Sequence, residues 1–239
     1  MNICLLMSGI IKNYDYIKNI IKLFDDKPDY NLFVFGHTFS FLGNPNLNKE
    51  NIDYKSSVLI NKKLLKNYYT EIKFIKNYDE FDEDGFDNRI YSQWQNVKKA
   101  LNLATKYSKK HNIDYDIIIK ARTDIDINQN ELFKHIDCIN KTGKVVFGNQ
   151  SCHILQDQLF LGPTDKMKKI LNLVNFYYKY CNKHPWKKIA DERKSLLINN
   201  EKHLRFGGMS EILLYQHTIK NLKQKEYIIV NKFWNIIRS

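Results

Sequence analysis

Two carboxylates one residue apart, Asp124 and Asp126, close the segment DYDIIIKARTDIDIN (residues 114–128). Such hard oxygen ligands suit Mg²⁺ or Mn²⁺, which often complete their coordination with water and substrate phosphates. A cation held there would neutralise a diphosphate leaving group. Arg122 stands two residues earlier, where it could contact a phosphate or fix the aspartates. The D-x-D pair with its arginine therefore predicts a site for a divalent cation and an anionic ligand.

Other interpretations of this D-x-D pair differ in how well the spacing supports them. An EF-hand calcium loop fails, because the required glycine is Gln129 and the closing glutamate is His135. A phosphatase-type nucleophile of the haloacid-dehalogenase kind also follows a strand, but that family usually places it on the first strand. A purely structural interpretation, in which turn aspartates pair with Arg122 or Lys120, stays open.

The elements around the D-x-D pair are expected to place it at an edge of a sheet. Residues 2–9 and 30–39 have the apolar pattern of buried strands, and residues 14–24 between them have helical spacing. A strand, helix and strand in this order favour a parallel sheet covered on both faces. Ligands of such sheets bind beyond the carboxyl ends of the strands. If the strand from residue 117 stays extended through 126, Asp124 and Asp126 point the same way.

The remaining patterns complete one α/β domain spanning residues 1–239. They predict helices over 61–69, 91–110, a stretch capped by Thr164 and Asp165 that reaches 181, and one capped by Ser210. They predict strands over 71–75, 144–149, 155–163 and 226–233.

Composition limits the function classes without choosing among them. A formal charge of +12 attracts nucleic acid, anionic membrane or a phosphorylated small molecule, and the excess of Asn, Lys and Ile is typical of an AT-rich genome. The four cysteines are far apart, so we expect reduced core thiols and neither a disulfide framework nor a zinc site. No apolar run approaches the roughly 18 residues of a spanning helix. We expect a soluble, cytoplasmic protein.

Four segments in a fixed order resemble the small GT-A type nucleotide-sugar glycosyltransferases. They are YSQWQNVKKALNLATKY, IIIKARTDIDI, LQDQLFLGPTDKM and GGMSEILLYQHTI. In those enzymes an S-Q helix leads to an R-x-D strand, then a D-Q-F/L segment and a P-E helix. Here Met209, Ser210 and Glu211 lack the proline and keep the glutamate. The resemblance implies a GT-A (Rossmann-like) mixed, mostly parallel sheet with helices on both faces. It also implies a nucleotide-binding half over about 1–128 and an acceptor-side half over about 129–239. The bias toward Asn, Lys and Ile suits a large AT-rich DNA virus or an AT-rich bacterium.

The resemblance also implies which residues bind the donor nucleotide. They are Ser8, Gly9, His37, Thr38, Arg89, Gln93, Arg122 and Asp124. Gly9 would permit close approach of the backbone to the nucleotide. Asp126 is the first choice as direct ligand of Mn²⁺ or Mg²⁺. Asp124 would assist through the ribose, the sugar or water.

A transfer reaction also needs a carboxylate near the anomeric carbon, as a base for the acceptor hydroxyl or as a stabiliser of positive charge. Asp157 is the first choice, because it interrupts an apolar strand pattern; its structural alternative is a hydrogen-bonded residue at a strand end. Glu211 is the second, with a helix-dipole role as its alternative.

Taken together, these residues predict a metal-dependent glycosyltransferase of the hexosyl or deoxyhexosyl class. It would move a sugar from a nucleotide-diphosphate donor to a glycan or other hydroxyl acceptor. The alternative function is a basic nucleic-acid-binding or scaffolding protein without catalytic activity. That alternative predicts steeply salt-dependent binding that does not need Asp124 or Asp126, and no nucleic-acid motif supports it.

Overall fold

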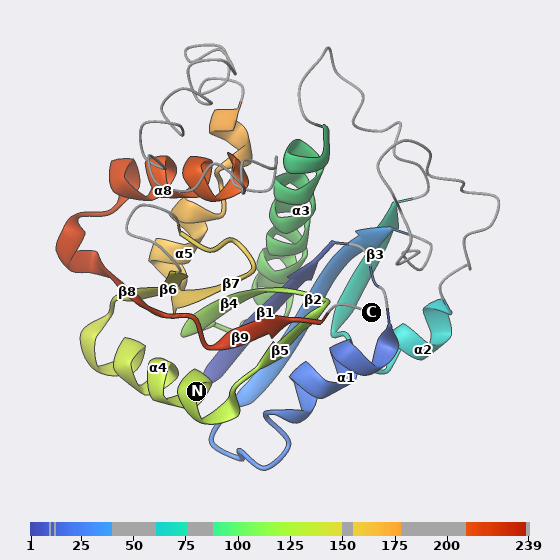
Figure 1. The fold of residues 1–239 in the computed structure, drawn as a ribbon. Coiled ribbons are helices and arrows are strands. Elements are labelled where there is room, and N and C mark those ends of the chain that lie inside the picture. Colours follow the sequence, from blue (N-terminus) through green and yellow to red (C-terminus); the bar gives the residue numbers. More distant parts are fainter. Residues whose placement is uncertain are drawn as a thin grey trace.

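The structure is a computed structural model, and it describes residues 1–9, 11, 13–39, 61–75, 88–149, 155–177 and 209–237. Within these residues a seven-stranded sheet has the order β3-β2-β1-β4-β7-β6-β8 (Figure 1). Its strands are β1 (Asn2–Ser8), β2 (Asn31–Phe39), β3 (Glu71–Ile75), β4 (Ile117–Arg122), β6 (Val145–Asn149), β7 (Leu159–Pro163) and β8 (Tyr227–Asn231). A second, two-stranded sheet pairs β5 (Ile125–Ile127) with β9 (Trp234–Ile236).

The larger sheet is mixed and mostly parallel, which confirms the predicted fold class. β3, β2, β1 and β4 are parallel neighbours, β7 is antiparallel to both β4 and β6, and β8 is parallel to β6. The central strands β1 and β4 are mostly apolar, as expected of strands covered on both faces. Leu5 and Leu6, on opposite faces of β1, are both buried.

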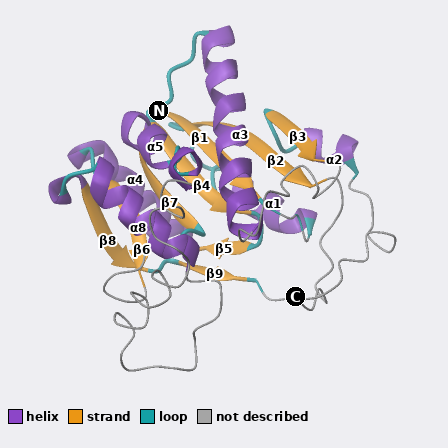
Figure 2. Ribbon diagram, turned by 90° about the horizontal axis from the view of Figure 1, so that it is seen from above, coloured by secondary structure: helices purple, strands orange, loops and turns teal. Residues whose placement is uncertain are grey.

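Helices cover both faces of the sheet and form a separate core on each (Figure 2). The helices are α1 (Tyr14–Lys22), α2 (Lys62–Lys66), α3 (Asn88–His111), α4 (Gln129–Thr142), α5 (Thr164–Ile170) and α8 (Met209–Asn221), with a short 3-10 helix η4 (Gln224–Glu226). On one face α3, α5 and α8 pack around Trp94 and Phe160. On the other, α1, α4 and the β5–β9 pair pack around Ile17, Ile136 and Trp234.

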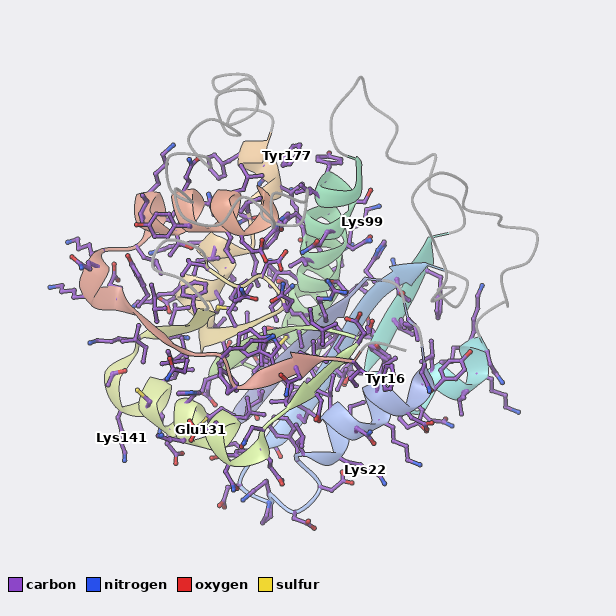
Figure 3. The ribbon with its side chains drawn as sticks, viewed as in Figure 1. Tyr16, Lys22, Lys99, Glu131, Lys141 and Tyr177 are labelled. Carbon is purple, nitrogen blue, oxygen red and sulfur yellow. The ribbon has the colours of Figure 1, made fainter. Side chains whose placement is uncertain are left out.

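Lysines at the ends of α1 and α4 project away from the sheet, as amphipathic helices require. Lys22 and Lys141 both point outward in Figure 3 and stand in the last turn of their helices. A positive charge there interacts favourably with the helix dipole. These lysines are a solvent-facing part of the +12 charge, since both side chains are exposed.

α4 was not predicted, although both of its end signals are present in the sequence. Asn128 is its N-cap and accepts a hydrogen bond from the backbone N–H of Glu131 at 3.1 Å. Gly143 ends it in the left-handed conformation, with φ of 63°. An asparagine and a glycine at these two positions are the usual helix boundaries.

Three predicted boundaries were wrong, and two of them concern the candidate site. The strand from residue 117 does not continue through 126, because Thr123 and Asp124 form a turn before β5. The strand predicted over 155–163 begins only at Leu159, so Asp157 lies in the bend before β7. α5 ends at Ile170, and Thr164 and Asp165 do not cap it, since no side chain caps its N-terminus.

The two cysteines within the described residues are free thiols. Cys4 is buried in β1, as expected of a core thiol, whereas Cys138 is only half-buried on α4. Cys152 and Cys181 lie outside the described residues. Among the helices that the structure describes, none is long and apolar enough to span a membrane.

The β5–β9 pair is held on the sheet by close packing of Trp234 against Gly148 in β6. A Cβ atom at position 148 would lie 2.0 Å from Cη2 of Trp234. We expect Gly148→Ala to lower the free energy of unfolding by about 1–3 kcal/mol, because the indole must move away. Urea denaturation measures this. Gly143→Asn is the control, since asparagine tolerates the left-handed region, and an unchanged midpoint for Gly148→Ala would contradict the packing.

Candidate active site

Three predicted donor-binding residues lie side by side at the carboxyl edge of the sheet. Ser8 ends β1 and is in register with His37 of β2 on one side and with Arg122 of β4 on the other. The three strands are parallel, so their carboxyl ends meet at this edge. The structure thus brings together residues that are more than a hundred positions apart in the sequence. This is the edge where open α/β sheets bind ligands.

The turn after β1 is held open beside these residues. Gly9 has φ of 114°, a conformation that side chains rarely adopt, and no described atom lies within 4 Å of the position a Cβ would take. Thr38 donates its hydroxyl proton to the carbonyl oxygen of Gly9 at 2.5 Å. His37 Nδ1 lies 2.8 Å from Oδ1 of Asn96 on α3. The backbone at Gly9 is therefore accessible to a ligand and is fixed from β2.

Arg122 and Asp124 form a bidentate ion pair at the end of β4. Arg122 Nε donates to Oδ1 of Asp124 and one terminal nitrogen donates to Oδ2, both at 2.8 Å. The side chain of Arg122 is 36% exposed, whereas that of Asp124 is 3% exposed. Burial opposes the charge on Arg122, but the hydrogen bonds and charge of Asp124 outweigh it and raise the pKa of Arg122. Asp124 is thus paired with Arg122, the contact that the structural interpretation of the D-x-D pair expects.

The side chain of Asp126 lies in a different environment from that of Asp124. It lies on β5, opposite Asn235 of β9, and is exposed. The turn at Asp124 breaks the extended geometry under which both carboxylates would point the same way. In this conformation both oxygens of Asp124 are bonded to Arg122, and the described residues contain no group of three His, Cys, Asp or Glu side chains that could hold a metal ion. Asp124 is therefore buried and engaged by Arg122, whereas Asp126 is exposed.

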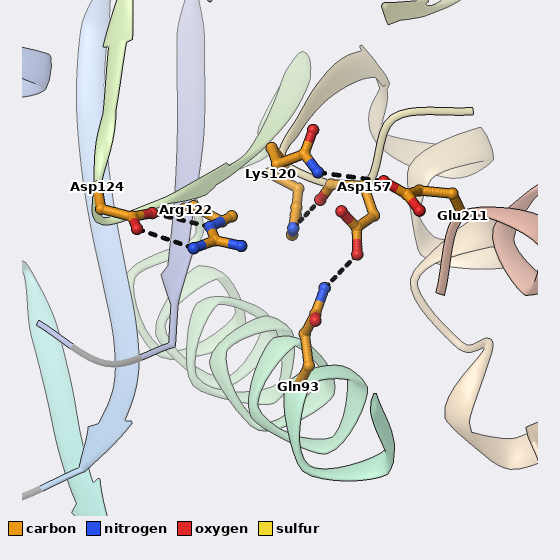
Figure 4. Close-up of polar contacts among 7 residues, drawn as sticks. Gln93, Lys120, Arg122, Asp124, Asp157 and Glu211 are labelled. Atoms are coloured by element: carbon orange, nitrogen blue, oxygen red, sulfur yellow. Dashed lines mark hydrogen bonds and ion pairs between the residues drawn. The ribbon is translucent and has the colours of Figure 1, made fainter. Parts of the chain in front are cut away.

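Asp157 is held at three points in the bend before β7, and Figure 4 shows two of them, the contacts with Gln93 and Lys120. Its Oδ2 atom accepts hydrogen bonds from Nε2 of Gln93 at 2.5 Å and from the hydroxyl of Ser210 at 2.6 Å. Its backbone carbonyl oxygen accepts a hydrogen bond from Nζ of Lys120. Asp157 is 4% exposed. A carboxylate this enclosed has a defined orientation, which a proton acceptor requires.

Lys120 is a fully buried cation in the apolar run of β4. Its Nζ atom lies 5.8 Å from the ring centre of Trp94 and 5.9 Å from that of Phe160. Aromatic faces attract a cation at such distances and offset part of the cost of its burial.

Burial, which has the largest effect, and the charge of Arg122 lower the pKa of Lys120, and its net value is about 8. The carboxylates of Asp157, Asp124 and Glu211 act in the opposite direction. In Figure 4, Lys120 lies between the Arg122–Asp124 ion pair on one side and the carboxylates of Asp157 and Glu211 on the other. The pKa of Lys120 therefore depends on charged groups on both sides of the candidate site.

Glu211 lies close to Asp157 but is held differently. It stands in the first turn of α8 and is half-buried. Its Oε1 atom accepts a hydrogen bond from Nε2 of Gln158 at 3.3 Å. The backbone carbonyl of Gln158 in turn accepts a hydrogen bond from the N–H of Arg122 at 2.9 Å. Gln158 therefore contacts both Glu211 and Arg122, and it is the residue next to Asp157.

The structure gathers most of the predicted site residues at this edge. Gln93 contacts Asp157, and Asn96, one turn later on α3, contacts His37, so the same helix reaches both parts of the site. The side chain of Arg89 lies outside what the structure describes.

Sequence reasoning missed the roles of Ser210 and Lys120. Ser210 was expected to cap α8, but the helix begins at Met209, and Ser210 instead bonds Asp157. The available signal for Lys120 was a charge in the apolar run IIIKA.

Lys120 should make stability depend on pH in the alkaline range. The unfolded chain holds this proton up to about pH 10.5 and the folded chain only up to about pH 8, so the unfolded state binds more protons between these values. The contribution of Lys120 to the free energy of unfolding therefore rises with pH, by about 1 kcal/mol between pH 8 and 9. Above pH 9 the raised pKa of the buried Cys4 thiol works in the opposite direction.

Denaturant titrations of the wild type and Lys120→Met at pH 8 and pH 9 isolate this contribution. The wild type should gain stability relative to Lys120→Met over this interval, while Lys109→Met, at an exposed position on α3, should behave as the wild type. Equal pH dependence in the wild type and Lys120→Met would show that the buried lysine does not change its protonation there.

The described residues thus define a mixed α/β fold with a polar site at the carboxyl edge of its sheet. No protein-family model matches the chain, and no curated protein matches it in sequence. Among solved structures, it is similar to a glycosyltransferase involved in the glycosylation of the major capsid of PBCV-1, with 9% identity, a TM-score of 0.45, and 95% of this chain and 82% of that chain covered.

Two further solved structures show the same degree of similarity. Mouse xyloside xylosyltransferase 1 has 11% identity and a TM-score of 0.41, with 96% of this chain and 85% of that chain covered. The 4-diphosphocytidyl-2C-methyl-D-erythritol synthase of Anaerococcus prevotii has 9% identity and a TM-score of 0.45, with 99% and 90% covered. At these identities and TM-scores, the similarity does not identify a reaction or a substrate for this chain.

Proposed function

We propose that this protein is a glycosyltransferase that uses a nucleoside-diphosphate sugar as its donor. The observation that carries the proposal is one edge of the sheet that holds both a partly exposed arginine, Arg122, and an enclosed carboxylate, Asp157. An arginine is suited to a diphosphate and a positioned carboxylate to an acceptor hydroxyl. The four sequence segments that resemble GT-A type glycosyltransferases contribute these same residues.

In this proposal the donor nucleotide lies over the ends of β1 and β2. The open turn at Gly9 admits the base or ribose, beside Ser8, His37 and Thr38. The guanidinium of Arg122 faces the diphosphate and lowers the cost of the charge that develops on it. Arg89 and Gln93 were expected to contact the nucleotide as well, and Gln93 is instead bonded to Asp157.

The proposed chemistry is a substitution at the anomeric carbon of the sugar. The acceptor hydroxyl oxygen forms a bond to this carbon, and its proton passes to the carboxylate of Asp157. The bond between the anomeric carbon and the diphosphate oxygen breaks, and the nucleoside diphosphate leaves. Glu211 is the second candidate for the carboxylate. We propose a sugar of the hexose or deoxyhexose class, a glycan or other hydroxyl acceptor, and a cytoplasmic location.

Metal dependence is a separate part of the prediction. Mn²⁺ or Mg²⁺ at Asp124 and Asp126 would supply charge neutralisation at the diphosphate. In the described conformation both carboxylate oxygens of Asp124 accept hydrogen bonds from Arg122, so no step of the proposed reaction is assigned to a cation. A requirement for Mn²⁺ that is lost in Asp126→Asn would establish the metal site.

A thermal-shift panel of UDP-, GDP- and dTDP-sugars, with Mn²⁺ and with EDTA, tests the proposal. A ligand that binds the native state raises the melting temperature by mass action. We expect at least one nucleotide sugar to raise it, and binding undiminished in EDTA would contradict the metal dependence alone. No shift with any member of the panel, together with steeply salt-dependent binding of DNA or RNA, would favour the nucleic-acid alternative over a transferase.

A further inference from the structure

We infer that Ser210 and Gln93 are positioning residues that fix the carboxylate of Asp157 for proton transfer. Both bind the same oxygen, Oδ2, and among the described residues none donates a hydrogen bond to Oδ1. Oδ1 is then the oxygen that receives the proton of the acceptor hydroxyl. This inference rests on the proposed glycosyltransferase function.

The direction of the hydrogen bonds through Ser210 is set by Trp94. The indole Nε1–H of Trp94 lies 3.0 Å from the hydroxyl oxygen of Ser210, and an indole N–H can only donate. Ser210 must therefore accept this bond, and its single hydroxyl proton is directed to Oδ2 of Asp157 at 2.6 Å. Trp94 and Ser210 are both buried, so water does not compete readily for these bonds.

Gln93 also restrains Oδ2 of Asp157, and it does so from a second helix, α3. Its side-chain amide donates from α3 at 2.5 Å, while Ser210 donates from α8. Lys120 fixes the backbone of the same residue from β4. Asp157 is thus restrained by three elements that meet only in the folded protein, its carboxylate by α3 and α8 and its backbone by β4. An orientation restrained in this way is what a proton acceptor needs in order to meet its substrate in a reactive geometry.

The two donors also decide which carboxylate oxygen reacts. Each hydrogen bond to Oδ2 stabilises negative charge on that atom, and a lone pair engaged in a bond is not available for a new proton. The acceptor hydroxyl is therefore expected to approach Oδ1. Loss of either donor would let the carboxylate rotate about its Cβ–Cγ bond without removing it from the site.

Steady-state kinetics of Ser210→Ala and Gln93→Ala, with the nucleotide sugar that the wild type turns over, test this role. We expect kcat to fall about 10- to 100-fold in each, since a small misplacement of a reacting group has effects of this order. The KM for the donor should stay within about twofold of the wild type, because neither contact is to the donor. Ser210→Thr keeps the hydroxyl and should retain most of the activity.

Two matched variants control for general effects of the substitutions. Ser108→Ala and Gln95→Ala change half-buried residues of α3 whose side chains do not bond Asp157, and both variants should leave kcat and KM unchanged. Melting temperatures of all variants, measured in the same buffer, show that the folded enzyme is being assayed.

The outcomes separate this inference from the proposed function. If the wild type transfers sugar and Ser210→Ala has the same kcat, the positioning role is overturned and the glycosyltransferase function stands. A parallel loss of kcat and melting temperature that Ser210→Thr does not rescue would also overturn it, since it indicates a structural role. If the wild type turns over no nucleotide sugar in the panel, the proposed function fails and the positioning role fails with it.

Discussion

Asp157→Asn should reduce sugar transfer by about 10²- to 10⁴-fold, the usual contribution of a general base. Asparagine has nearly the same shape as aspartate, and its carbonyl oxygen can accept the bonds from Gln93 and Ser210. Its amide cannot take a proton from an acceptor hydroxyl. Product formation measured by chromatography should therefore fall while the donor still raises the melting temperature.

Asp165→Asn is the matched control for this variant. Asp165 is an exposed aspartate in the first turn of α5, outside the candidate site. It should retain the kcat of the wild type. If Asp157→Asn keeps more than half of that kcat, Asp157 is not the proton acceptor, and Glu211→Gln becomes the variant in which to look for the loss.

Arg122→Ala should have the second largest effect, because it removes both the partner of Asp124 and the proposed cation for the diphosphate. The buried carboxylate of Asp124 would lose both of its hydrogen bonds from the guanidinium. We expect a loss of about 2–3 kcal/mol in the free energy of unfolding, less than for a fully buried pair because Arg122 is partly exposed. For a chain of this length, that corresponds to a melting temperature lower by about 5–10 °C.

Donor binding distinguishes the two functions of Arg122. In the Arg122→Ala background, Asp124→Asn removes the unpaired charge and should recover much of the stability. It should not recover the thermal shift produced by the nucleotide sugar, because the cation for the diphosphate is still missing. An Arg122→Ala protein that binds the donor as tightly as the wild type would contradict the placement of the diphosphate at Arg122.

The sequence predicted the fold best where local patterns determine it. The strands β1 and β2 follow from their apolar runs, β3 follows from the short strand-like segment EIKFI, and the helix between β1 and β2 follows from its spacing. β5 and β9 are three residues each and pair across more than a hundred residues of chain. No local pattern determines a pairing of that kind, so the position of Asp126 on a separate small sheet could not be predicted.

The candidate site was predictable in its residue types but not in its contacts. The D-x-D pair, Asp157 and Glu211 were identified from their motifs, and the fold does bring Asp124, Asp157 and Glu211 to one edge. The bond between Ser210 and Asp157 joins residues 53 positions apart. Ser210 therefore had only its local signal, which is that of a helix cap.

The most direct measurement is a crystal structure of the protein with the nucleoside diphosphate whose sugar derivative gives the largest thermal shift. The proposed function predicts the nucleotide over the ends of β1 and β2, with a phosphate oxygen within roughly 3 Å of the guanidinium of Arg122. It would be contradicted by a nucleotide bound elsewhere, for example in the pocket of about 290 Å³ that Lys73, Lys99 and Lys106 line along α3 and β3.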